Sequence, residues 1–113
     1  MRALAVATLL MGISATSIAT TSIAALGQEY NLVIRDHKFE PAEIRVPAGK
    51  RVSIYVSNED ATPEEFDSTA LKVEKVIPGK SKGLVRIGPL TPGRYEFIGE
   101  FNAETAKGVV IAE

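Results

Sequence analysis

Short segments in which apolar and polar residues alternate run through most of this chain. Between residues 50 and 57, Val52, Ile54 and Val56 would point to one side of an extended backbone, and Ser53 and Tyr55 to the other. A period of two over this length is typical of half-buried β-strands. The pattern predicts strands over residues 30–35, 43–46, 50–57, 72–77, 82–87, 95–99 and 108–112.

Turn-forming residues separate these segments. Pro47-Ala48-Gly49, Pro78-Gly79 and Pro92-Gly93 each suit a tight turn. Seven to eight short strands at this spacing, with no helical periodicity, predict an all-β fold. We expect a Greek-key β-sandwich made of two packed sheets.

The first residues are typical of an export signal. Arg2 supplies a positive start, residues 3–13 are apolar but too short to span a bilayer, and Ala25 and Gly27 suit cleavage before Gln28, with a slightly earlier cut as the alternative. We therefore expect residues 1–27 to be a signal peptide and residues 28–113 to form one periplasmic domain.

Charge and cysteine content restrict the function of that domain. Residues 28–113 contain 12 Lys and Arg and 14 Asp and Glu, a formal charge of −2, and no basic stripe that would track a nucleic-acid backbone. The chain has no Cys. Without disulfides, such a small exported domain must be stabilised by its hydrophobic core.

Two polar stretches do not match the strand pattern. Residues 58–68 and residues 99–108 both follow an apolar segment and carry more polar side chains than a connection needs. We interpret both as loops, and loops set on a rigid sandwich often carry function.

The order of apolar and turn residues also matches a known pattern. It consists of Phe39-x-Pro41-x-x-Ile44-x-Val46-Pro-Ala-Gly49-x-x-Val52, Asn58 with Thr62-Pro-Glu-Glu-Phe66, Leu90-x-Pro-Gly93-x-Tyr95-x-Phe97, and Lys107-Gly-Val-Val-Ile111. This pattern resembles the cupredoxin-like domain. The resemblance implies a Greek-key sandwich in which copper-binding members hold the metal at one end.

The copper ligands themselves are missing from the chain. By the resemblance, Glu64 stands at the position of the first His ligand, Gly99 at the Cys, Asn102 at the second His, and Thr105 roughly at the axial Met. A type 1 copper site needs a thiolate and two imidazoles. With no Cys and one His, the sequence excludes that site and blue-copper electron transfer.

The loop residues further resemble a Cys-less periplasmic subgroup of cupredoxin-like proteins associated with bacterial high-affinity iron uptake. The segments concerned are Thr62-Pro-Glu-Glu-Phe-Asp-Ser68 and Tyr95-x-Phe-x-Gly-Glu-Phe-Asn102. The resemblance implies two partners, a periplasmic metal-binding protein and an inner-membrane iron permease. The subgroup carries carboxylates where copper ligands would stand.

The candidate metal ligands are therefore His37, Glu64, Glu65 and Glu100. One imidazole with hard carboxylate oxygens suits ferrous or ferric iron, manganese or divalent copper better than cuprous copper. Glu64 and Glu65 are adjacent, so their side chains would point apart in an extended segment. His37 could equally be a surface residue beside Asp36.

We expect a metal-handling protein, with iron or copper as the ion. The alternative is a metal-free docking module of a periplasmic complex. An independent enzyme has little support, because no Ser/His/Asp, Cys/His or nucleotide motif is present. An accessory role in ferrous iron oxidation stays open.

Overall fold

The computed structural model describes residues 28–113 together with Gly12. The predicted signal peptide otherwise lies outside the described residues. Within them, no helix has the length and apolar character needed to cross a membrane. The described chain forms nine strands and one short 3-10 turn: β1 (Gln28–Arg35), β2 (Lys38–Glu40), β3 (Glu43–Val46), β4 (Val52–Asn58), β5 (Glu64–Ser68), β6 (Val73–Ile77), β7 (Ser81–Ile87), β8 (Gly93–Gly99), η1 (Glu100–Asn102) and β9 (Lys107–Ala112).

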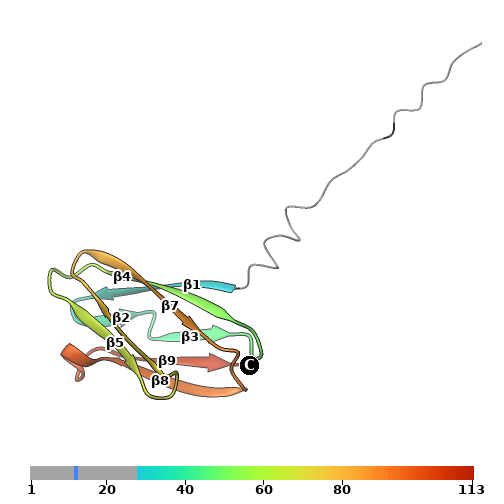
Figure 1. The fold of residues 1–113 in the computed structure, drawn as a ribbon. Helices are drawn as coiled ribbons and strands as arrows, with labels where there is room; N and C mark the ends of the chain where they lie inside the picture. The colour runs from blue at the N-terminus through green and yellow to red at the C-terminus, as the bar shows by residue number, and fades with distance from the viewer. Residues whose placement is uncertain (1–11, 13–27) are drawn as a thin grey trace, which may run out of the picture.

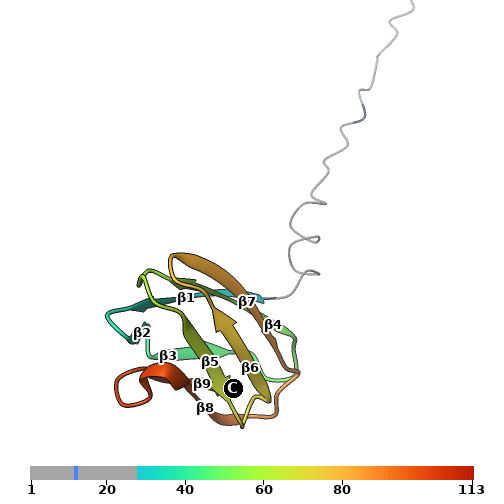
Figure 2. The ribbon, with the colours of Figure 1, turned by 60° about the vertical axis from the view of Figure 1, so that its left-hand side comes forward.

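The strands form two sheets packed face to face (Figures 1 and 2). One sheet has the order β2-β1-β4-β7 and the other β3-β9-β8-β5-β6. Both are mixed, because β1 runs parallel to β4 and β3 runs parallel to β9, whereas the other pairs are antiparallel. The predicted all-β sandwich is confirmed.

Alternation along the strands builds the core. Val52, Ile54 and Val56 on β4 are buried, as predicted, and the outward Tyr55 between them is exposed. Phe66 and Phe97 stack with ring centroids 4.7 Å apart, and the ring of Phe39 packs edge-on 5.0 Å from that of Phe97. This aromatic cluster joins β2, β5 and β8.

Two strands were not predicted. The hairpin strand β2 was too short to stand out, and β5 lies inside the stretch 58–68 that we interpreted as a loop. On β5, Glu64, Phe66 and Ser68 face inward, and Glu65 and Asp67 are only half-buried. Two of the three inward residues are polar, so β5 lacks the apolar–polar alternation from which the other strands were predicted.

Candidate functional site

Three connections meet at the end of the sandwich opposite the C-terminus: the β1–β2 turn, the β4–β5 connection and the β8–β9 loop (Figure 1). Thr105 Oγ1 donates a 2.6 Å hydrogen bond to His37 O, and His37 N donates one of 3.0 Å to Asp60 Oδ2. The two polar stretches predicted to carry function therefore lie side by side.

Glu64 faces the interior at this end, and its side chain is almost fully buried, with 1% of the residue exposed. Its Oε1 accepts hydrogen bonds from the backbone N–H of Phe101 at 2.9 Å and of Glu65 at 3.0 Å. Its Oε2 accepts one of 2.7 Å from Asn102 Nδ2. A buried carboxylate is stable only with such donors. We call Glu64 with these three donors the Glu64 network.

Gly99 ends β8 directly against the Glu64 carboxylate. A Cβ added to Gly99 would lie 2.6 Å from Glu64 Cδ and 2.7 Å from Ala106 Cβ, closer than real Cβ contacts. The backbone at Gly99 is ordinary and extended, with φ −92°. Glycine is therefore required for space and not for backbone conformation.

The residues at this end do not fit a type 1 copper ion. The positions that the resemblance assigns to the first His, the Cys and the second His hold Glu64, Gly99 and Asn102, which offer no sulfur and no imidazole. Asn102 Nδ2 is directed at Glu64, and Thr105 Oγ1 at a backbone carbonyl. We therefore assign no copper chemistry to this set.

His37 lies at the same end of the sandwich, but it contacts Asp60 and not the Glu64 network. It sits in the left-handed backbone region with φ 59°, and its Nδ1 lies 3.5 Å from Asp60 Oδ2. Asp60 also accepts a 2.8 Å hydrogen bond from the N–H of Asp36. Hydrogen bonding from the His37 N–H, followed by that from Asp36, lowers the pKa of the Asp60 carboxyl. Asp60 thus organises the β1–β2 turn.

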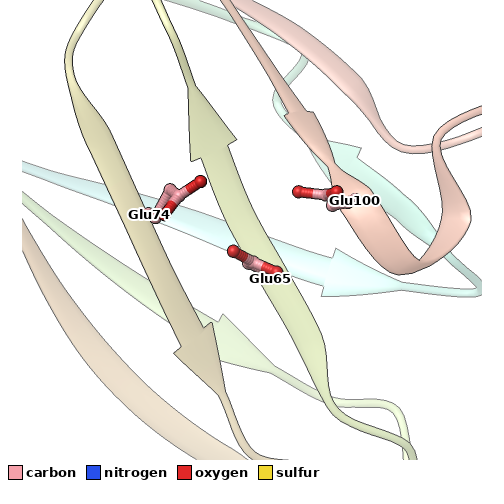
Figure 3. A group of neighbouring side chains, drawn as sticks. All are labelled: Glu65, Glu74 and Glu100. Atoms are coloured by element: carbon pink, nitrogen blue, oxygen red, sulfur yellow. The ribbon is translucent and has the colours of Figure 1, made fainter.

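A group of carboxylates gathers on the outer face of the second sheet. One ligand oxygen from each of Glu65 on β5, Glu74 on β6 and Glu100 on η1 lies within 4.8 Å of the others (Figure 3). We call these three residues the surface carboxylate group. Glu65 is half-buried and the other two are exposed. Of the four predicted ligands, the structure brings Glu65 and Glu100 together, and leaves His37 and Glu64 outside the group.

A hydrogen bond and like charges act together on the Glu100 carboxyl of this group. Hydrogen bonding with the Asp67 carboxyl, then the negative charges of Glu65, Asp67 and Glu74, raise the pKa of Glu100. Crowded carboxylates take up a proton or a cation to relieve their repulsion. Carboxylate oxygens are preferred by hard cations, including Mg²⁺, Ca²⁺ and Mn²⁺.

Glu74 is the member that the sequence did not indicate. It lies on β6 opposite Asp67 on β5, and Glu65 is opposite Val76. Residues two apart on one strand share a face, so Glu65, Asp67 and Glu74 lie on the same outer surface. Finding Glu74 would have required the β5–β6 register, and β5 itself was not predicted.

The family of the chain follows from comparison with known proteins. A family model described as a cupredoxin-like domain matches residues 3–112. An uncharacterised protein of Rickettsia prowazekii (strain Madrid E) is 39% identical over 84 residues, covering 74% of this chain and 66% of that protein. The chain thus spans just under two thirds of the length of that relative.

Solved structures of copper proteins share the fold. Auracyanin A, a blue copper protein from Chloroflexus aurantiacus, matches with a TM-score of 0.66 and 15% identity over 77% of this chain and 100% of its own. The metal-binding domain of the Streptococcus pneumoniae Cu(I)-exporting P-type ATPase CopA, solved with Cu(I), matches with a TM-score of 0.64 and 17% identity over 75% of this chain and 84% of its own. The family model matches almost the whole sequence, and the described residues form the same sandwich, so the chain belongs to the cupredoxin-like domain family.

Proposed function

We propose that this protein is a periplasmic metal-handling protein that binds a hard cation, iron in particular, at the surface carboxylate group for a transport system. The observation that carries the proposal is the convergence of Glu65, Glu74 and Glu100, with ligand oxygens within 4.8 Å of one another. After the hydrogen bond with Asp67, repulsion from neighbouring carboxylates raises the pKa of Glu100, and cation binding would relieve that repulsion.

The position of the group suits transfer of a cation. Two of its three members are exposed, so a bound ion would keep water ligands and exchange readily with a partner protein. The resemblance to the Cys-less iron-uptake subgroup supports iron as the cargo. It also supports a periplasmic metal-binding protein and an inner-membrane iron permease as the partners.

A second candidate function is a metal-free docking module. Phe101 favours it, because this aromatic side chain is 51% exposed on η1, next to Glu100 and beside the altered end of the sandwich. Exposed aromatic side chains are enriched in protein interfaces. In this alternative the carboxylates would contact basic groups of the partner and hold no ion.

Metal titrations separate the two functions. Fe(II) under anaerobic conditions and Mn(II) in air would be titrated against the wild type and the variants E65Q, E74Q and E100Q. The matched control is E29Q, which removes the same charge from an exposed strand residue of the other sheet. The proposal expects binding roughly tenfold weaker or worse in each group variant and unchanged in E29Q.

The same titration can contradict the proposal. If the wild type binds neither ion at millimolar concentration, or if E29Q weakens binding as much as E74Q does, the surface carboxylate group is not a site. A wild type that binds no ion, together with loss of a partner interaction on Phe101→Ala, would favour the docking module.

A further inference from the structure

We infer that the Glu64 carboxylate replaces the metal ion in joining the two ligand-bearing segments, so that this end of the sandwich closes without metal. The three positions that correspond to copper ligands still converge. Glu64 contacts Asn102 Nδ2 at 2.7 Å, and it lies directly against Gly99. The point of convergence, however, is occupied by the Glu64 carboxylate itself. The inference does not depend on a cation at the surface carboxylate group.

Space is the first reason, because position 99 cannot supply a metal ligand while Glu64 is in place. A Cβ on Gly99 would lie 2.6 Å from Glu64 Cδ and 2.8 Å from Glu64 Oε2. A side chain at position 99 and the Glu64 carboxylate therefore exclude one another. By the resemblance, a Cys and a His at these positions would share a copper ion, whereas here the Glu64 carboxylate lies against a glycine.

Hydrogen bonding is the second reason. Both oxygens of Glu64 are engaged by donors from three residues, Glu65, Phe101 and Asn102. Among residues 28–113, every buried side-chain nitrogen or oxygen has a hydrogen-bond partner. A metal ion entering here would have to displace donors that already satisfy the carboxylate.

The Glu64 network joins β5 to the β8–β9 loop, which are the two segments that a shared metal ion would join. Glu64 belongs to β5, whereas Phe101 and Asn102 belong to η1 in the β8–β9 loop. The network holds η1 against the sandwich, and Thr105 holds the same loop to His37 O. The exposed Phe101 and Glu100 are thereby presented in fixed positions.

A polarity exchange tests the network. N102D places a second carboxylate against Glu64, and should lower the folding equilibrium constant at pH 7 by about tenfold or more, about 1.4 kcal/mol. E64Q alone should be milder, because Asn102 can turn its amide to accept from the new NH₂ group. In the E64Q background, the new amide at position 64 can donate to the carboxylate that N102D introduces. In E64Q, N102D should therefore lower the folding equilibrium constant by no more than about threefold.

A control variant shows whether the effect of a new carboxylate is specific to position 102. N31D makes the same chemical change at an exposed residue of β1 and should have equal, small effects in both backgrounds. If N102D does not fold, recovery of a folded E64Q/N102D protein is the expected result. Equal penalties for N102D in both backgrounds, or no recovery, would contradict the inference.

EDTA should not lower the denaturant concentration at which the wild type unfolds. Any shift of this midpoint by millimolar Cu(II), or by millimolar Fe(II) under anaerobic conditions, comes from binding outside the Glu64 network and should be the same in E64Q. Exchange of the Phe101 amide hydrogen should be as slow in EDTA as in its absence. Loss of Phe101 protection in EDTA, or a metal-induced shift of the midpoint that E64Q abolishes, would show that a metal ion and not the carboxylate alone closes this end.

Discussion

The carboxylate of Glu64 fills the space that any side chain at Gly99 would need, with only 2.6 Å between Glu64 Cδ and the position of a Cβ on residue 99. The two residues lie on neighbouring strands of one sheet, β5 and β8. Their sizes are therefore coupled: a buried carboxylate on one strand requires the absence of a side chain on the other.

The first prediction concerns this coupling. G99A should destabilise the protein by about 1–3 kcal/mol through overpacking. In an E64A background the penalty for G99A should shrink, and the part caused by Ala106 should remain. Denaturant unfolding of the four proteins in the cycle measures the difference.

Glu65 provides the matched control for that cycle. Its side chain points away from Gly99, so E65A should leave the G99A penalty unchanged. A penalty for G99A that is the same in the wild type, E64A and E65A would show that Glu64 and Gly99 are not coupled.

The second prediction concerns pH and Asp60. Because hydrogen bonds from the His37 and Asp36 N–H groups lower the pKa of Asp60, its contribution to stability is fully present above the unfolded pKa, about 3.9. That contribution is lost as the pH falls through the lower folded pKa. D60N should reduce stability by about 1 kcal/mol at pH 7 and have less effect in acid.

Thermal or denaturant unfolding between neutral and strongly acidic pH checks this prediction. D36N, at an exposed neighbour whose N–H remains in place, is the control and should follow the wild-type profile. A D60N protein that is as stable as the wild type at pH 7 would contradict the role assigned to Asp60.

Apart from the three-residue strand β2, the sequence predicted the strands whose inward residues are mainly apolar, and it failed at β5, where two of the three inward residues are polar. Val52, Ile54 and Val56 mark β4 without ambiguity. On β5, Glu64 and Ser68 take inward positions because η1 and β8 supply their partners: Phe101 and Asn102 donate to Glu64, and Ser68 Oγ donates to Glu96 O. Those partners are far away in the sequence, so a local pattern cannot show them.

The same limit applies to the candidate site. Glu64 and Glu65 were predicted to point apart, and they do: Glu64 enters the core and Glu65 joins the surface carboxylate group. Which of the two would be buried depends on hydrogen-bond donors in the β8–β9 loop. Glu74 became a neighbour of Glu65 and Glu100 only through the pairing of β5 with β6.

The third prediction concerns the proton on Glu100. Its pKa is raised in the folded protein, first by hydrogen bonding with Asp67 and then by neighbouring charges. The folded state therefore holds this proton to higher pH than the unfolded chain, and stability falls as the pH rises through the interval between the two pKa values. E100Q should remove that fall and be at least as stable as the wild type at pH 7.

Glu104 is exposed in the same β8–β9 loop, so E104Q is the appropriate comparison and should keep the wild-type dependence on pH. Unfolding midpoints across the acidic range give the result. If E100Q is less stable than the wild type at pH 7 and equal to it in acid, Glu100 makes a favourable contact and the like-charge account of the group is wrong.

The most direct test of the whole account is a crystal structure of the protein soaked in Mn(II), with anomalous scattering used to locate the ion. The account predicts a peak between Glu65, Glu74 and Glu100, and no peak between Glu64, Gly99 and Asn102. A manganese ion bound to Glu64 at the interior position would contradict it. So would fully soaked crystals with no ion at the surface carboxylate group.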